Sequence, residues 1–182
     1  MSKFRSGNGA DWLDFLLTQL GRYREVQHEY LSDAGALRTW FSERELAPAQ
    51  APTEADVARA RELREALHAA ARAALRDAAP PAAAQAILEA ALADDKPLQL
   101  KRSAQGLKIA RPQTAREALG RIARQALETL AGPQRAQLHA CGDDTCSGIF
   151  LDTTGRRRWC SDERCGNRAR VRAHRARTRA DP

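Results

Sequence analysis

Four cysteines near the C-terminal end of the chain are the residues with the clearest chemistry. They form two close pairs, Cys141-x4-Cys146 and Cys160-x4-Cys165, separated by thirteen residues. Two close pairs joined by a short segment are typical of a four-cysteine zinc site, because each pair supplies two thiolates from one turn. Four thiolates leave no open coordination position for water or substrate, so the pattern predicts one structural Zn²⁺ and not a catalytic ion.

Two other interpretations of the cysteines stay open at this point. They could form disulfides or a redox pair, although disulfides are uncommon in cytosolic proteins, or they could be unpaired buried thiols. His139 and His174 lie close to the cysteines in sequence. A single histidine at such a position is more often a surface residue than a ligand, so the expected metal ligands are the four cysteines.

The residues between and after the cysteines predict the elements that position them. Two short runs, 148–151 and 156–159, read as strands, and the four residues between them read as a turn. Ser161 and Asp162 are typical helix N-cap residues, and no proline interrupts the chain from there to Ala180. The turn between Cys141 and Cys146 is expected to form a zinc knuckle, and a second knuckle lies between Cys160 and Cys165. The expected order of first knuckle, hairpin and helix is that of a treble-clef finger.

The predicted C-terminal helix carries the candidate nucleic-acid contacts. Its arginines recur at intervals of three and four residues, which places them on one face of the helix. Guanidinium groups crowded on one face repel one another unless phosphates neutralise them. The expected contacts are Arg164, Asn167, Arg168, Arg172, Arg175 and Arg179.

Other features of this helix leave alternatives for the arginine stripe. A second stripe, expected to pack against the body of the protein, consists of Ala169, Ala173, Ala176 and Ala180. The arginines could then be a solvated face of a helix that the alanines hold, or they could dock on an acidic protein surface. Trp159 is expected to pack in the small core of the finger.

Composition restricts the class of protein. The chain has 182 residues and a net charge of +7, and its excess of positive charge is concentrated near the C-terminus, where ten arginines and two acidic residues lie between Thr153 and Ala180. This indicates a polyanionic partner. No apolar run approaches the ~18–20 residues of a membrane span. Asp11 and Asp14 interrupt the stretch that a secretory signal would need, so the expected location is the cytoplasm.

The first 131 residues predict a mainly helical domain. Apolar residues recur at helical spacing through most of this part, and Thr53 with Asp56 and Thr114 with Glu117 have the spacing of capping boxes. Two alternating runs joined by a short connector predict one β-hairpin. The expected elements are helices over about 11–20, 33–47, 53–80, 81–95 and 114–131, with the hairpin over 98–110.

The end of the chain resembles the CGNR zinc finger family. The resemblance rests on Arg158-Trp159-Cys160-Ser161 and on Cys165-Gly166-Asn167-Arg168. In that family the finger follows an N-terminal module called the ABATE domain, and two segments here are similar to its helices, Leu13-Asp14-Phe15-Leu16-Leu17-Thr18 and Leu37-Arg38-Thr39-Trp40-Phe41. The resemblance implies a helical ABATE-like domain with one β-hairpin over 9–133 and a CGNR-type finger with a basic C-terminal helix over 134–182.

The fold class expected from all of this is mainly α with small β-hairpins, with a treble-clef-like four-cysteine finger at the C-terminus. The resemblance implies a stress-induced bacterial transcription regulator, a role that is itself assigned by inference, with double-stranded DNA as partner. An RNA-binding protein and a zinc-stabilised adaptor for protein interactions are the alternatives. The N-terminal domain would sense a small-molecule effector or mediate assembly, and a homodimer would supply the base contacts that one finger lacks.

An enzyme is not expected. The sequence contains no recognisable Ser/His/Asp set, no glycine-rich phosphate loop and no HExxH motif.

Overall fold

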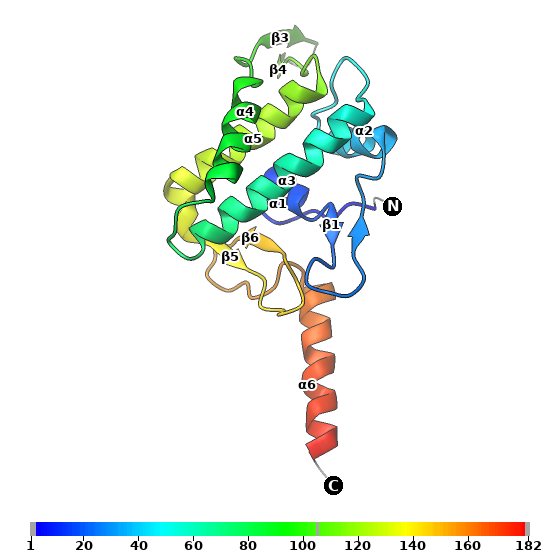
Figure 1. Cartoon of the computed structure of the whole chain (residues 1–182), viewed down its shortest axis with the longest axis vertical. Helices are drawn as coiled ribbons and strands as arrows, with labels where there is room; N and C mark the ends of the chain where they lie inside the picture. Colours follow the sequence, from blue (N-terminus) through cyan, green and yellow to red (C-terminus); the bar gives the residue numbers. More distant parts are fainter. Residues whose placement is uncertain (1–2, 105, 181–182) are drawn as a thin grey trace.

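The computed structural model describes residues 3–104 and 106–180, without the side chains of residues 179–180. The fold is mainly helical with small β-hairpins, as the sequence predicts. Figure 1 shows the helices stacked in one body, with the β3–β4 hairpin at one end and α6 projecting from the other. The elements are α1 (Asp11–Leu16), β1 (Gln19–Leu20), β2 (His28–Glu29), α2 (Ala34–Glu43), α3 (Glu54–Ala74), α4 (Ala82–Ala93), β3 (Leu100–Ser103), β4 (Gly106–Ile109), α5 (Ala115–Ala131), a 3-10 turn (Pro133–Gln137), β5 (Leu138–Ala140), β6 (Ile149–Leu151), a π-helical turn (Asp162–Gly166) and α6 (Asn167–Ala180).

The starts of the two long helices confirm the predicted caps. At α3, the side chain of Thr53 accepts from the backbone N–H of Asp56, and the Asp56 carboxylate accepts from the backbone N–H of Thr53. This is a complete capping box, which satisfies two N–H groups that the helix itself cannot pair. At α5, Thr114 accepts from Glu117, but the Glu117 carboxylate accepts from Gln113 at 2.7 Å instead of from the cap residue.

One apolar core runs through the helical part and into the finger. Trp12 and Trp40 are fully buried, and Trp12 Nε1 donates to Thr129 Oγ1 on α5. Three residues of the β5–β6 hairpin, Leu138, Ile149 and Leu151, belong to the same buried cluster as these helices. The finger therefore shares part of its core with the N-terminal helices. Among the residues described, no helix is both long and apolar enough to cross a membrane.

The first predicted helix is too long, and the prediction of one hairpin in the N-terminal domain is wrong. Helix α1 ends at Leu16, after which Thr18 Oγ1 donates to the carbonyl of Phe15, and the chain then forms β1, which pairs with β2. The cause is tertiary. Arg64 on α3 is 2% exposed and makes two hydrogen bonds, of 2.8 and 2.6 Å, to the carboxylate of Glu29 on β2. This contact holds the β1–β2 hairpin, which the sequence does not predict, against the helices.

The predicted returning strand over 156–159 is also wrong. Strand β6 pairs with β5, which precedes the first cysteine, with Leu138 opposite Leu151. The residues after β6 stay in a loop, because the carboxylate of Asp152 accepts from the backbone N–H groups of Thr154 and Arg157 at 2.8 and 2.7 Å. The first cysteine pair therefore lies in the loop that closes β5–β6.

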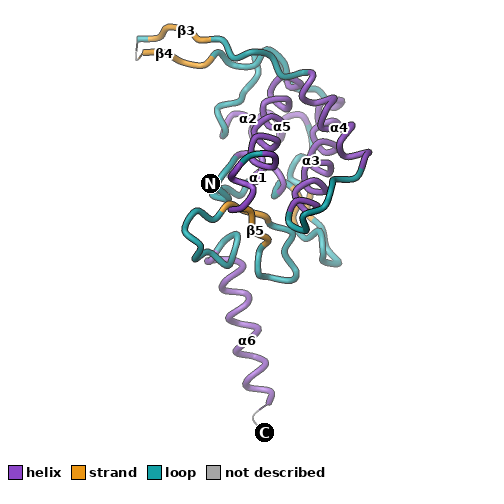
Figure 2. Tube along the Cα trace, turned by 90° about the vertical axis from the view of Figure 1, so that its left-hand side faces the viewer, coloured by secondary structure: helices purple, strands orange, loops and turns teal. Residues whose placement is uncertain are grey.

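Helix α6 does not pack against the body, which corrects the interpretation of the alanine stripe. Both Figure 1 and Figure 2 show α6 projecting from the finger as a single helix. Ala173 and Ala176 are exposed, and the side chain of Ala180 lies outside the described set. The helix also begins later than predicted, at Asn167, after a π-helical turn for which Ser161 supplies no side-chain cap.

Candidate metal centre

The four cysteine sulfurs form one compact cluster. All four Sγ atoms lie within 4.8 Å of one another, and the distances from Cys160 Sγ to Cys146 Sγ and Cys165 Sγ are 3.6 and 3.5 Å. A tetrahedron with Zn–S bonds of about 2.3 Å has S–S edges of about 3.8 Å, so the sulfurs are spaced to hold one zinc ion. Within the described part of the chain, neither His139 nor His174 joins this cluster.

The metal site needs glycine at position 148, where the backbone passes close to a sulfur from each pair of cysteines. A Cβ added to Gly148 would lie 2.8 Å from Cys160 Sγ and 3.2 Å from Cys146 Sγ. The backbone N–H of Gly148 donates to Cys146 Sγ at 3.3 Å, and the backbone N–H of Cys160 donates to Cys141 Sγ at 3.4 Å. Hydrogen bonds of this kind favour the charged thiolate, which is the form that binds zinc.

A buried carboxylate ties the first knuckle to α6. The side chain of Asp143 has no exposed surface, and it pairs with Arg168 at 2.7 Å and with Arg172 at 2.6 Å. Burial would raise the pKa of Asp143, but the hydrogen bonds from Arg172 and Arg168 outweigh burial and hold that pKa well below its ordinary value. The carboxylate is therefore ionised at neutral pH. Arg168 Nη2 also donates to Cys165 Sγ at 3.0 Å.

A small second core surrounds the sulfurs. Phe150 is fully buried against Cys141, Cys160 and Cys165, and Trp159 packs against this cluster, as predicted from the sequence. The guanidinium of Arg157 lies 4.5 Å from the centre of the Phe150 ring. These contacts cover Cys141, Cys160 and Cys165, which are buried, whereas Cys146 is half-buried.

Arg157 also connects the finger to the N-terminal segment. It donates from Nη1 to the carbonyl of Gly7 at 2.9 Å, and from Nε to the carbonyl of Trp159 at 2.9 Å. Nearby, the backbone N–H of Leu151 donates to the carbonyl of Asn8. The loop from 152 to 161 is thus fixed by the chain's own N-terminal residues. Arg157 and Gly7 are 150 residues apart in the chain, so no local sequence pattern reveals their contact.

The predicted nucleic-acid residues fall into two groups. Arg164, Asn167 and Arg175 are exposed, whereas the half-buried Arg168 and the more exposed Arg172 pair with Asp143. The side chain of Arg179 is outside the described residues. Sequence reasoning missed the role of Asp143, although the i, i+4 spacing of Arg168 and Arg172 is a signal that one acidic residue could bind both.

Two more arginines complete the charged surface of α6. Arg170 pairs with Asp162 at 3.1 Å, a contact between two well-exposed side chains that solvent weakens. Arg177 is exposed further along the helix. Between Asn167 and Ala180 the sequence has six arginines and no acidic residue.

Comparison with known families agrees with this geometry. The ABATE family model, described as "Putative stress-induced transcription regulator", matches residues 9–133, and the model of the CGNR zinc finger matches residues 137–178. A search of curated proteins returned no match. The first match covers more than half of the chain, and the second contains all four cysteines. The chain belongs to the ABATE family, with a CGNR zinc finger as its C-terminal part.

Proposed function

We propose that this protein is a transcription regulator that binds double-stranded DNA through α6. The observation that carries the proposal is the projection of this arginine-rich helix away from the rest of the molecule (Figure 1). A projecting helix can approach a duplex without interference from the body. With its side chains, an α-helix is about 10–12 Å across, and the major groove is about 12 Å wide.

The arginines divide into two roles in this proposal. Arg168 and Arg172 set the direction of α6 through Asp143. Arg164, Arg175 and Arg177 make no ion pair with any residue described, so they are available for phosphates. Asn167, exposed at the start of the helix, is the residue that would reach a base edge.

The zinc and the N-terminal domain support this contact without taking part in it. When bound, zinc joins the two knuckles and so fixes the start of α6. The N-terminal domain would sense an effector or mediate assembly, and the protein would have no catalytic activity of its own. We place it in the cytoplasm, where reducing conditions keep the four thiols available for the metal.

Fluorescence anisotropy with the zinc-loaded full chain tests the proposal. Random duplex DNA and a structured RNA would be titrated at about 50 and 200 mM salt, with and without a chelator. The Arg175→Gln/Arg177→Gln variant should bind DNA more weakly and flatten the slope of log K against log salt by about 2. The Arg59→Gln/Arg76→Gln variant, which changes one exposed arginine on α3 and one in the turn that follows it, is the matched control.

Three outcomes would contradict the proposal. Preference for structured RNA at matched salt would make the protein an RNA-binding protein. Binding to neither nucleic acid would favour the adaptor. An equal change of slope in the control variant would mean that the affinity comes from net charge and not from α6.

A further inference from the structure

A cavity of about 460 Å³ lies where the N-terminal domain meets the finger. Its lining comes from the N-terminal segment, the end of α1, the β1–β2 hairpin, the first knuckle and the first turn of α6. Figure 1 shows the loop between β1 and β2 beside the start of α6. A volume of this size is within the range of cavities that bind small molecules.

The β1–β2 loop on one side of this cavity has a defined shape. Arg24 in the loop donates to Thr145 of the first knuckle, from Nη2 to Oγ1 at 2.8 Å and from Nε to the carbonyl at 3.3 Å. The loop also requires glycine at Gly21, which has a φ of 73° and where a Cβ would collide with the carbonyl of Val26. The cavity is therefore enclosed by elements that contact one another directly.

The side chain of Arg5, in the wall of the cavity, lacks a partner. Arg5 is half-buried, its Nε is buried without a hydrogen-bond acceptor, and it makes no ion pair with any residue of the described chain. A cation that is partly removed from water costs free energy unless an anion or an acceptor compensates it. The planar fork of a guanidinium matches a carboxylate, which it can bind through two hydrogen bonds. Arg5 therefore indicates a place for an anion.

The other cations of the wall are compensated or exposed. Arg168 pairs with the carboxylate of Asp143 at 2.7 Å. Arg24 is exposed and bonds to a neutral residue, and His28 is exposed as well. Arg5 is thus the half-buried cation of this wall for which the described residues supply no anion.

The negative groups of the wall limit the charge that a ligand can carry. Glu25 is exposed and has no ion pair within the described residues, and Cys146 lies in the wall as one of the four thiolates. Four thiolates around one Zn²⁺ leave a formal negative charge. These groups would repel a doubly charged anion such as phosphate more strongly than a single carboxylate bound to Arg5.

Part of the wall is apolar. Leu17 is buried, Leu20 and Tyr30 are half-buried, and Val26 is 62% exposed. Ligand cavities typically combine such an apolar lining with a few polar groups that fix the orientation of the ligand. An anion with a hydrocarbon group could therefore contact Arg5 and this apolar part together.

We propose that the cavity binds a small organic monoanion, with its carboxylate on Arg5 and its aromatic or branched aliphatic group against Leu20 and Val26. The binding itself does not depend on DNA. The ligand would contact both the β1–β2 loop and the residues that precede α6, so it would be the effector that the N-terminal domain senses. That role, unlike the site, rests on the proposed function.

Two-dimensional ¹H–¹⁵N NMR of the zinc-loaded full chain tests the site. The probes are benzoate and 3-methylbutanoate, with benzamide as the uncharged analogue and inorganic phosphate as the anion without an apolar group. For the two acids we expect saturable shifts of the amides of residues 20–30 and 145–147, with a Kd of about 1 mM, a strength that ligands of this size reach. Benzamide and phosphate should bind at least about ten-fold more weakly.

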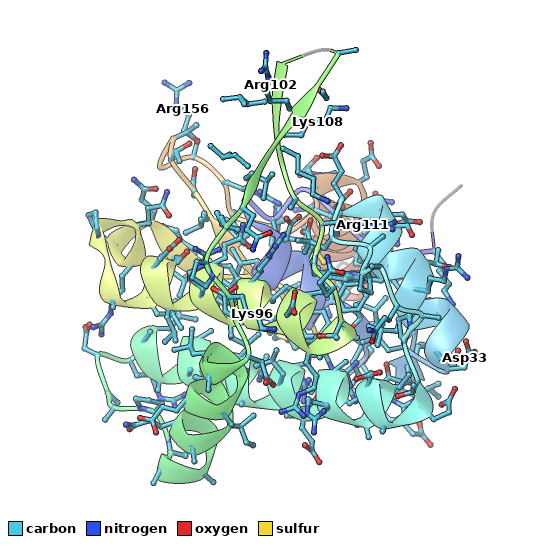
Figure 3. All side chains as sticks on the ribbon, turned by 90° about the horizontal axis from the view of Figure 1, so that it is seen from above. Asp33, Lys96, Arg102, Lys108, Arg111 and Arg156 are labelled. Carbon is cyan, nitrogen blue, oxygen red and sulfur yellow. The ribbon has the colours of Figure 1, made fainter. Side chains whose placement is uncertain are left out.

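Three variants identify the group that holds the carboxylate. Arg5→Gln should raise the Kd for benzoate at least about ten-fold, and it should fold because its side chain has no partner to lose. Glu25→Gln should lower the Kd, because a repelling charge is removed. Arg102→Gln is the matched control and should leave the Kd unchanged, because Figure 3 shows Arg102 on the β3–β4 hairpin, which Figure 1 places at the end of the molecule opposite α6. Circular dichroism checks that every variant is folded.

Four results would overturn the site. The first is the absence of saturable shifts with either acid at about 20 mM, well above the expected Kd. The second is unchanged binding of benzoate to Arg5→Gln. The third is phosphate that binds as tightly as benzoate. The fourth is a set of shifts confined to residues 160–164, which would place the acid in the neighbouring cavity of about 200 Å³ that Arg5 also lines.

The affinity for duplex DNA is a separate readout of the effector role. Saturating benzoate should change the Kd for DNA about five-fold or more, and Arg5→Gln should abolish that change. An unchanged DNA affinity would overturn the effector role. If the chain showed the expected shifts but bound no DNA, the site would be supported and the proposed function would be contradicted.

Discussion

The guanidinium of Arg168 lies 2.7 Å from the buried carboxylate of Asp143. These residues belong to different parts of the finger, because Asp143 lies within the first knuckle and Arg168 in the first turn of α6. The same guanidinium donates to the sulfur of Cys165, and Arg172 binds the other carboxylate oxygen of Asp143. The direction of α6 is therefore set by a buried ionic contact in addition to the metal ligand that precedes the helix.

Replacing Asp143 by asparagine should loosen α6 without removing a metal ligand. We expect the free energy of unfolding to fall by about 2 kcal/mol, since three hydrogen bonds, two from Arg168 and one from Arg172, lose their charged acceptor while both arginines can still reach water. Urea unfolding measures this loss, and hydrogen exchange should show faster exchange along α6. The control is Asp144→Asn, because Asp144 is exposed and pairs with Arg172 alone. Equal effects of the two variants would mean that Asp143 does not hold the helix.

Removing the metal should affect the finger more than the helical domain. With zinc chelated, we expect hydrogen exchange to speed up from Cys141 to the end of α6, because four unpaired thiols cannot keep the two knuckles together. Leu138 and Ile149 lie in the core shared with the N-terminal helices, so the amides of α3 and α5 should keep their protection. Elemental analysis of the untreated protein should give one zinc per chain. A single cooperative loss of all helices on chelation would contradict this division.

The metal site can be predicted from the sequence because its ligands come in pairs that are close together in the chain. Each pair of cysteines is separated by four residues, and four thiolates in two close pairs have few arrangements other than a tetrahedron. The N-cap residues Thr53 and Thr114 can also be predicted from the sequence, because a cap depends on residues within one turn of helix. The helices with strong apolar periodicity were predicted with errors mainly at their ends.

The errors come from contacts between residues far apart in the chain. The sequence predicts that residues 148–151 pair with 156–159, but strand β6 pairs with β5, which precedes Cys141, and both strands contribute to the shared core. The alanine stripe was expected to be buried, yet the ion pairs at Asp143 direct α6 away from the body. Nothing in the local sequence indicates that Arg64 is buried on α3 and binds Glu29. This contact stabilises the β1–β2 hairpin.

His68 should make stability depend on pH. It is 9% exposed on α3, packs edge-on against Tyr23, and has Arg22, Glu65 and Arg72 as charged neighbours. Burial, followed by the charge of Arg22, lowers the pKa of His68 from 6.5 to about 4, although the charge of Glu65 and a hydrogen bond with the backbone of Ser147 oppose the shift. Between these two values the unfolded chain binds a proton that the folded chain does not, so stability falls as the pH is lowered.

The expected loss from this residue is about 2 kcal/mol between pH 7 and pH 5. Urea unfolding at the two pH values, in excess zinc, measures the total loss, to which the thiolates and carboxylates also contribute. The His68→Gln variant retains those contributions, so the difference between its loss and that of the wild type isolates His68. The same pH dependence in both proteins would show that His68 does not cause it.

Adding one methyl group at Gly148 should weaken metal binding. The Cβ of Gly148→Ala would lie 2.8 Å from Cys160 Sγ, which is closer than such atoms approach, so the sulfur or the backbone of β6 must move. We expect zinc affinity, measured by competition with a chromogenic chelator, to fall by about 10–100-fold, as it does when groups that orient metal ligands are altered. Gly155→Asn is the control, because nothing lies within 4 Å of a Cβ there and asparagine tolerates its positive φ of 67°. Unchanged affinity in Gly148→Ala would mean that the knuckles adjust to the methyl group and that the spacing of the sulfurs does not depend on this glycine.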